Sequence, residues 1–282
     1  MKTAVILGAG QMGQAARRLL NRNKIALAAF GDNSPQKWNR EAVPPVLPLA
    51  EALALRPEIA IVGVLDEERS AQLTEQARKL GFEGAFLRMS DAAEQIDVRA
   101  ATMRRISARL RAEKIPGALA ELGVYRGDFA WQLNEEFPER KLYLFDTFEG
   151  FDARDVAAER EKSSSRAQTG DFADTGLQAV LGRMPHGEKI IVRRGYFPET
   201  AEGLEETFAL VSLDADLYAP TLAGLRWFYP RMARGGMILL HDYNSSQFDG
   251  VRRAVKEYED EAERLALVPL CDLHGTAVIV KP

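Results

Sequence analysis

The chain has 282 residues, 46% of them hydrophobic and 28% charged, and a formal net charge of −4. This length exceeds one typical domain and predicts a soluble protein of two compact units. The acidic balance excludes the basic face that nucleic-acid binding needs, and no apolar stretch reaches the length of a membrane span. The single cysteine, Cys271, excludes an internal disulfide and indicates a reducing cytoplasm, in which we expect it to be a small buried hydrophobe.

The first ninety residues alternate strand-like and helical patterns. Strands are expected at 3–7, 26–30, 59–64 and 84–87, and helices at 12–21 and 67–80. This alternation predicts a smaller Rossmann-like α/β domain over residues 1–90. Residues 91–117 are predicted to form a connector helix whose arginines, among them Arg99, lie on a solvated face.

A glycine-rich turn follows the first predicted strand. Gly8, Gly10 and Gly13 form a GxGxxG pattern between a strand and a helix, and Asp32 follows the next strand. In dinucleotide-binding folds these glycines approach a phosphate and the carboxylate binds ribose hydroxyls. The pattern indicates a possible second nucleotide site for NAD(P) or another nucleotide, and the alternative is a glycine turn kept only for tight helix–strand packing, with no ligand.

A second α/β series begins near residue 118. Strands are expected at 118–122, 141–145, 189–193, 208–213, 237–240 and 276–280, and helices at 175–183 and 221–232. The polar segment 152–172 is long for a connection, and such segments are commonly mobile lids. Residues 118–282 are therefore predicted to form the larger domain, a sheet with helices on both faces.

The strand 118–122 leads into a second glycine turn of a different kind. Glu121, Gly123 and Gly127 form an acidic-GxxxG pattern, which resembles the turn against which class I methyltransferases hold the amino-acid end of S-adenosylmethionine (SAM). Asp146 closes the next strand, where a carboxylate can accept both ribose hydroxyls. The remaining cofactor-binding candidates stand beside these positions or after the third strand: Tyr125, Arg126, Thr147, Gly195 and Tyr196.

Acidic residues and a histidine close the fourth and fifth strands of this series. Asp214 and Asp216 follow one strand, and His241 and Asp242 follow the other. Oxygen-rich ligands suit Mg²⁺, and a cation can lower the pKa of a hydroxyl while a carboxylate or imidazole removes its proton. We expect Asp214, His241 and Asp242 to bind the metal, with Asp214 and His241 catalytic.

These motifs together resemble the macrocin O-methyltransferase family, which includes mycinamicin and novobiocin sugar O-methyltransferases. The resemblance covers about residues 118–282 through the segments ELGVYRGDF, LFDTFEGF, GDFADT, RRGYFPET, SLDADLYAPT, LLHDYN and GVRRAVKEY. It implies a SAM-dependent, Mg²⁺-requiring class I methyltransferase acting on sugar hydroxyls, with Asp214 and Asp242 as ligands. The family often has paired acidic residues where this chain has His241 and Asp242.

The sequence therefore predicts a cytoplasmic SAM-dependent O-methyltransferase whose partner is a small-molecule hydroxyl acceptor, which the resemblance implies to be a sugar. One alternative is an NAD(P)-dependent oxidoreductase that uses the first glycine turn. Another is a non-catalytic nucleotide- or sugar-binding regulator. A homo-oligomer is compatible with the sequence, which leaves the oligomeric state open.

Overall fold

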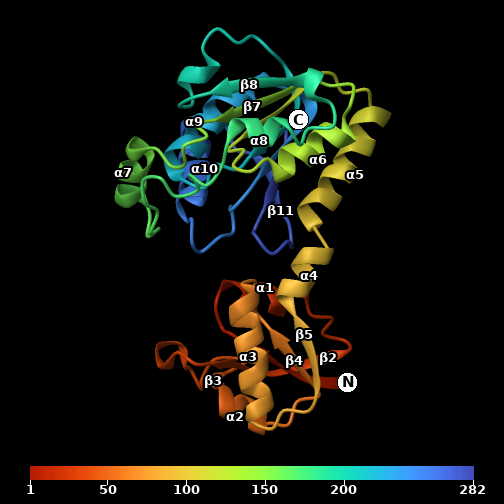
Figure 1. Ribbon diagram of the computed structural model, residues 1–282, viewed down its shortest axis with the longest axis vertical. Coiled ribbons are helices and arrows are strands. Elements are labelled where there is room, and N and C mark those ends of the chain that lie inside the picture. Colours follow the sequence, from red (N-terminus) through yellow and green to blue (C-terminus); the bar gives the residue numbers. More distant parts are fainter. The chain divides into compact units, whose positions relative to one another are not determined.

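The computed structural model describes residues 1–282, and the chain divides into two compact units, each with its own sheet (Figure 1). The first comprises Met1–Asp97 and Cys271–Leu273, and the second Val98–Leu270 and His274–Pro282. No helix in either unit is long and apolar enough to cross a lipid bilayer.

The first unit is built on five parallel strands in the order β3-β2-β1-β4-β5. Alternate residues of the central strand point to opposite faces of the sheet. Val5 and Leu7 pack in one apolar cluster with α2 and α3, whereas Ala4 and Ile6 pack in another with α1 and α4. The elements are β1 (Lys2–Leu7), α1 (Gln11–Leu19), β2 (Ile25–Asp32), η1 (Pro35–Lys37), β3 (Val46–Pro48), α2 (Leu49–Ala54), β4 (Ile59–Val62), α3 (Glu67–Lys79), β5 (Ala85–Arg88) and α4 (Met89–Gln95).

The second unit has a seven-stranded sheet in the order β11-β12-β10-β9-β6-β7-β8, in which β12 is antiparallel to both of its neighbours. Its helices are α5 (Val98–Ala112), α6 (Asp128–Glu136), α7 (Ala153–Lys162), α8 (Leu177–Leu181), α9 (Tyr218–Phe228) and α10 (Gly250–Glu261), with short 3-10 turns at Gly187–Lys189, Glu199–Ala201 and Tyr229–Arg231. Its strands are β6 (Ala118–Leu122), β7 (Leu142–Asp146), β8 (Ile190–Arg194), β9 (Phe208–Leu213), β10 (Met232–Leu240), β11 (Ala266–Pro269) and β12 (Ala277–Val280).

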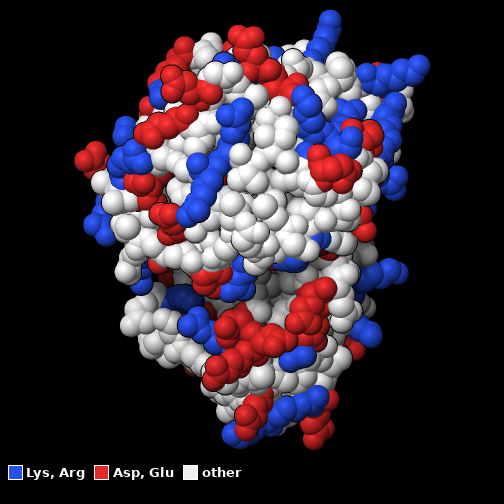
Figure 2. All heavy atoms as spheres, turned by 45° about the horizontal axis from the view of Figure 1, so that its top comes forward, with Lys and Arg blue, Asp and Glu red and all other residues white.

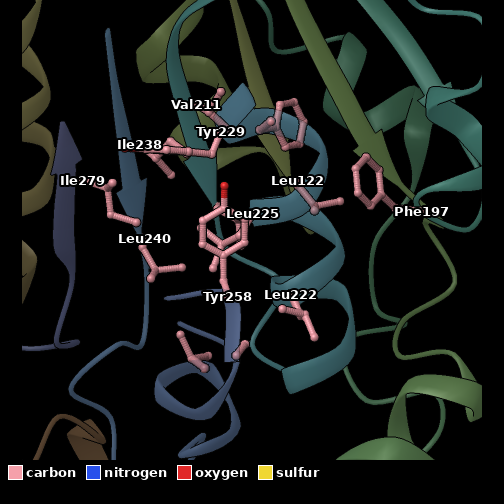
Figure 3. Packing of buried hydrophobic residues seen from close by; sticks show 14 of the residues in the cluster. Leu122, Phe197, Val211, Leu222, Leu225, Tyr229, Ile238, Leu240, Tyr258 and Ile279 are labelled. Atoms are coloured by element: carbon pink, nitrogen blue, oxygen red, sulfur yellow. The ribbon is translucent and has the colours of Figure 1, made fainter. Parts of the chain in front are cut away.

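Strand alternation also determines which helices cover this second sheet. Leu122, Val211 and Leu240 belong to the cluster that packs on α9 and α10 (Figure 3). Leu119 and Leu239 face the other way and pack with the apolar side of α5 and with α6. A residue on a central strand that shares the phase of Leu119 therefore points toward α5 and α6.

The chain changes direction at β6, and this places one end of the sheet at a crevice. From β6 it continues to β7 and β8 on one side, then crosses to β9 and β10 on the other. Ligands of open α/β sheets bind outside the carboxyl ends of the strands at such a switch point. The predicted site residues of the second domain follow these carboxyl ends.

Three local expectations are wrong. Residues 152–172 are not all loop, because α7 forms there with Asp152 as its N-cap and Asp155, Val156 and Glu159 buried. The connector is not one helix, since an extended Ile96 separates α4 from α5. Cys271 is exposed rather than buried, because it lies in the turn between β11 and β12 and outside both strands.

Candidate active site

The register of the second sheet aligns the predicted site residues in one row. Phe145 pairs with Leu122, Leu122 pairs with Leu213, and Leu213 pairs with Leu240. The next residues along β7, β6, β9 and β10 are therefore neighbours in the same order: Asp146, Gly123, Asp214 and His241. With strands spaced by about 4.8 Å, Asp146 and Asp214 stand roughly 10 Å apart across one edge.

Gly123 makes the close approach at the centre of this row. Its φ of +84° lies in the left-handed region, and a Cβ atom on it would lie 2.0 Å from the carbonyl oxygen of Asp214. Gly127 also has a positive φ, +77°, and is the N-cap of α6. The second glycine turn is therefore a backbone cradle that no other residue type fits without displacement.

Asp146 fixes this turn from the neighbouring strand. Its Oδ2 accepts hydrogen bonds from the backbone N–H groups of Val124, at 2.6 Å, and Tyr125, at 3.0 Å. Its Oδ1 accepts one from the N–H of Phe148, at 2.6 Å. Oδ2 thus uses both of its lone pairs on the turn, whereas Oδ1 of this half-buried group can accept one more hydrogen bond.

Glu121 is only 1% exposed and points toward α5. Its Oε1 accepts a hydrogen bond from the Ser212 hydroxyl at 3.0 Å, whereas its Oε2 has no protein partner. Burial raises the pKa of Glu121 to about 8, even though the charge of Arg99 acts in the opposite direction. An unpartnered buried carboxylate oxygen beside the glycine cradle fits a cationic ligand group such as the amino group of SAM.

Two other cofactor candidates hold the segment 170–175 in place. The Tyr125 hydroxyl donates to Asp174 Oδ1 at 2.7 Å, and the Arg126 guanidinium also binds Asp174. The Tyr125 ring makes an edge contact with the exposed Phe172, at 5.2 Å between centroids. These residues join the cofactor turn to the polar segment that was expected to be a lid.

The cofactor candidates in the loops after β7 and β8 are Thr147, Gly195 and Tyr196, and both side chains among them make hydrogen bonds within the protein. The Thr147 hydroxyl donates to the carbonyl of Gly150 at 3.0 Å. Gly195 has a φ of +131°, and Tyr196 next to it donates its hydroxyl to the buried Asp155 of α7 at 2.8 Å. Tyr196 thus ties α7 to the loop after β8, whereas the neighbouring Phe197 is part of the apolar core.

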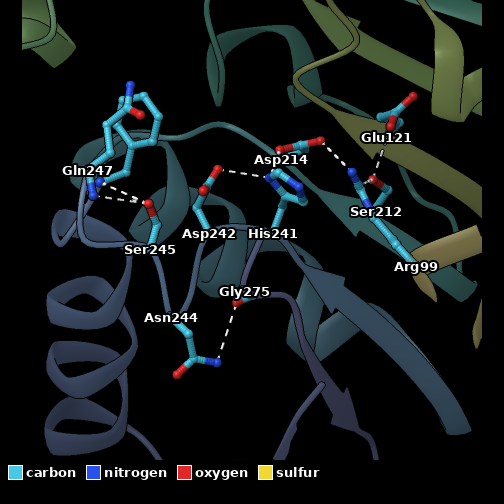
Figure 4. Close-up of polar contacts among 11 residues, drawn as sticks. Arg99, Glu121, Ser212, Asp214, His241, Asp242, Asn244, Ser245, Gln247 and Gly275 are labelled. Atoms are coloured by element: carbon cyan, nitrogen blue, oxygen red, sulfur yellow. Dashed lines mark hydrogen bonds and ion pairs between the residues drawn. The ribbon is translucent and has the colours of Figure 1, made fainter. Parts of the chain in front are cut away.

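The structure brings the predicted metal ligands together and adds Asp216, which was not among them. One ligand atom from each of Asp214, Asp216, His241 and Asp242 lies within 4.8 Å of the others. His241 Nδ1 is 2.8 Å from Asp214 Oδ1 and 2.8 Å from Asp242 Oδ2 (Figure 4). Asp216 and Asp242 have positive φ values of 56° and 55°, a conformation that turns both carboxylates into the cluster at some backbone cost.

Sequence reasoning missed Arg99, which was expected on a solvated helix face. The residue is 9% exposed, and its guanidinium donates to Asp214 Oδ2 and to Ser212 Oγ, both at 2.7 Å. It also stacks over the Phe129 ring, 3.9 Å from the centroid. Arg99 therefore connects the cofactor side, through Ser212 and Glu121, with the carboxylate cluster (Figure 4). A helical signal could have found it, because Arg99 stands four residues before Met103 and so shares the apolar side of α5, which the exposed arginines of that helix do not.

The charges in the cluster depend strongly on one another. Burial by itself would raise the pKa of Asp214, but Arg99 and His241 hold it well below its usual range. Burial by itself would lower the pKa of His241, but the charge of Asp214 and its hydrogen bonds raise it to about 10. Burial and the charges of Asp214 and Asp242 raise the pKa of Asp216 well above its usual value.

The donor set fits one divalent cation. Ligands about 2.1 Å from an octahedral ion are about 3 Å apart at right angles and about 4 Å apart on opposite sides. The separations in the cluster, 2.8 Å at the shortest and within 4.8 Å throughout, are compatible with one such ion. Three carboxylates and an imidazole nitrogen supply ligand chemistry that proteins use for divalent metals.

The first glycine turn has a packing explanation. A Cβ atom on Gly13 would lie 1.9 Å from the carbonyl oxygen of Gly8, so glycine there lets α1 approach β1. Gly10 has open space around it apart from the ammonium of Lys37, 3.9 Å away. Asp32 is 6% exposed, and its carboxylate already accepts hydrogen bonds from the Ala9 N–H at 2.7 Å and from Lys37 at 3.2 Å.

On the face drawn in Figure 2, basic and acidic side chains are interspersed and do not form one basic patch.

Comparisons with known proteins agree on the family. The macrocin O-methyltransferase (TylF) family model matches residues 67–281. A rhamnosyl-tetracenomycin C 4'-O-methyltransferase of Streptomyces olivaceus is 28% identical, with 59% of this chain and 66% of the relative covered. The mycinamicin III 3''-O-methyltransferase of Micromonospora griseorubida is 26% identical, with 52% and 61% covered. The chain thus spans less than two thirds of the length of either relative.

Two solved structures share the fold. The O-methyltransferase NovP superposes with a TM-score of 0.55 at 23% identity, covering 65% of this chain and 80% of its own. The calicheamicin methyltransferase CalS11 gives a TM-score of 0.54 at 20% identity, covering 75% and 85%. The second unit therefore has the class I methyltransferase α/β fold, and the chain belongs to the macrocin O-methyltransferase family.

Proposed function

We propose that this protein transfers a methyl group from SAM to a hydroxyl group of a sugar or a glycosylated small molecule. The observation that carries the proposal is the row across β7, β6, β9 and β10, in which Asp146, Gly123, Asp214 and His241 are neighbours on one sheet edge. Family membership supports the reaction, and the two relatives named above act on glycosylated compounds.

The cofactor would lie along the carboxyl ends of β6, β7 and β8. We assign the ribose hydroxyls to Asp146 and the methionine amino group to Glu121, whose Oε2 has no protein partner. Gly123 and Gly127 give the backbone room for the methionine end, and Gly195 and Tyr196 border the adenine side. When bound there, SAM supplies an electrophilic methyl group to an acceptor at the ends of β9 and β10.

The acidic cluster would prepare the acceptor. A divalent cation bound there lowers the pKa of a hydroxyl and orients it. We assign Asp214, His241 and Asp242 as ligands and Asp216 as the group that takes the hydroxyl proton. Asp214 and His241, the expected bases, suit this step less well, because Asp214 is bonded to both Arg99 and His241 and the His241 nitrogen lies between two carboxylates.

An oxidoreductase function is not favoured. Asp32, which would bind the ribose of NAD(P), is 6% exposed and its Oδ2 is paired with the Lys37 ammonium at 3.2 Å, whereas Asp146 is bonded to backbone N–H groups alone. Gly13 is explained by helix–strand packing, and Gly8 by its φ of +95°. A purely regulatory role gives no reason for a carboxylate cluster beside the cofactor crevice.

The test combines binding with turnover. The full-length chain should bind SAM and not NAD(P)H in calorimetric titrations, and should methylate members of a panel of rhamnosides, as read by mass spectrometry. Asp214→Asn should abolish turnover and leave SAM affinity nearly unchanged. Asp216→Asn should lower the turnover rate by roughly 10²–10⁴-fold. Asp260→Asn, an exposed carboxylate of α10, is the control and should change neither. Binding of NAD(P)H without SAM would overturn the proposal.

A further inference from the structure

One ligand of the cluster is a nitrogen atom, and the structure directs it at the carboxylates. His241 Nδ1 lies 2.8 Å from Asp214 Oδ1 and 2.8 Å from Asp242 Oδ2. The backbone N–H of His241 donates to the Leu213 carbonyl at 2.9 Å, which extends the β9–β10 ladder and fixes the start of the side chain. The imidazole also stacks against His274, with the ring centroids 5.4 Å apart. The nitrogen is therefore held in the place of a ligand atom.

A positive group is also bound within the cluster. The Arg99 guanidinium lies 2.7 Å from Asp214 Oδ2, and the Arg99 side chain is only 10% exposed. A fixed positive charge at this distance weakens the attraction of the carboxylates for any added cation, because charge repulsion is strong where water is excluded. This repulsion is the same for every dication, so it lowers the affinity of the site without selecting an ion, and a bond to nitrogen is what can offset it.

Of these two features, the nitrogen ligand is the one that distinguishes between dications. Mg²⁺ is a hard cation that binds oxygen ligands and keeps several waters, whereas imidazole is a good ligand for first-row transition metals. We infer that the cation site of this protein selects a first-row transition-metal dication over Mg²⁺, with His241 Nδ1 as a direct ligand. This inference rests on the proposed function for the existence of the cation site, and replaces the Mg²⁺ expected from the sequence.

The test uses Mn²⁺ as the probe, since Mn²⁺ is the weakest binder of the first-row series and so gives the most conservative comparison. The full-length chain is freed of metal with a chelator and titrated with Mn²⁺, with free Mn²⁺ followed by electron paramagnetic resonance. Mg²⁺ is then added as competitor. We expect one tight Mn²⁺ site with a Kd at least roughly tenfold below that of Mg²⁺. Pulsed spectra of the bound ion should show coupling to a directly bound nitrogen.

Variants identify the nitrogen. The chain has three histidines, so His274→Ala and His186→Ala are matched controls that should keep the coupling. His241→Asp makes the donor set all oxygen, and it should still bind Mn²⁺ but lose the nitrogen coupling and most of the preference over Mg²⁺. Thermal melting checks that this variant is folded. If it is not, the coupling in the wild type and in the two control variants decides the question.

The outcomes separate this inference from the proposed function. Equal affinity for Mn²⁺ and Mg²⁺, Mn²⁺ binding without nitrogen coupling, or no Mn²⁺ binding overturns the inference. SAM is titrated into the same preparation. If SAM fails to bind, the proposed function is wrong whatever the metal result.

Discussion

Replacing Arg99 by methionine removes the guanidinium and keeps most of the apolar stem against Phe129. The change breaks two 2.7 Å contacts, to Asp214 Oδ2 and Ser212 Oγ. Removing one partner of a fully buried ion pair costs about 3–5 kcal/mol. Asp214 is 21% exposed at its side chain and keeps His241 at 2.8 Å. We therefore expect a loss of about 2–3 kcal/mol in the free energy of unfolding of the second unit.

The loss can be measured by thermal melting of the metal-free protein. For a unit of this size 1 kcal/mol lowers the Tm by about 2–4 °C, so the Arg99→Met variant should melt roughly 5–10 °C lower. Arg109→Met is the matched control, because Arg109 lies on the same helix and pairs with Glu113 while both side chains are nearly half exposed. Such a pair contributes at most about 1 kcal/mol.

Turnover gives a second readout. Without Arg99, Asp214 loses the contact that orients its Oδ2, so kcat at saturating SAM should fall in Arg99→Met. The kcat of Arg99→Lys should lie between those of Arg99→Met and the wild type. If Arg99→Met and Arg109→Met melt within 1 °C or so of each other, the buried ion pair does not stabilise the protein and the reasoning is refuted.

Three further predictions follow from the crevice. Gly123→Ala would place a Cβ atom 2.0 Å from the Asp214 carbonyl oxygen and should abolish calorimetric SAM binding, whereas Gly203→Ala, with φ +70° and open space around it, should cost only about 1–2 kcal/mol of stability. Retained SAM affinity in the first variant would contradict the cradle. The pKa of His241 is raised to about 10, so its stabilising effect in the metal-free protein is complete below its ordinary value of 6.5 and is lost as pH rises toward 10. The Tm should therefore fall over this range less steeply in His241→Asn, and parallel profiles would argue against the assignment. The pKa of Glu121 is raised to about 8, so this carboxyl destabilises the fold increasingly from its ordinary value of 4.5 up to pH 8. Glu121→Gln should raise the Tm at pH 8 while weakening SAM binding, and a variant that binds SAM as tightly as wild type would exclude the amino-group contact.

Much of the second unit follows from its sequence alone. The strand 208–213 is as predicted, and the carboxylates at 146, 214 and 242 stand at the carboxyl ends of apolar strands. Parallel strands that alternate with helices bring their carboxyl ends to one edge, so the row of site residues could be inferred before any coordinates. The two glycine turns could also be recognised in the sequence, because a positive φ or a close backbone approach leaves glycine as the only residue that fits.

Tertiary structure decided what these residues touch. Arg99 stands in helical register with the apolar side of α5, unlike the exposed Arg104 and Arg109, but only the packing of α5 against the sheet aims it at Asp214. In the same way, the fold gives the Asp32 carboxylate its bonds to Ala9 and Lys37. Periodicity reports which face of an element is apolar, but a polar side chain finds its partner across distances in sequence that no local pattern encodes, here 115 residues between Arg99 and Asp214.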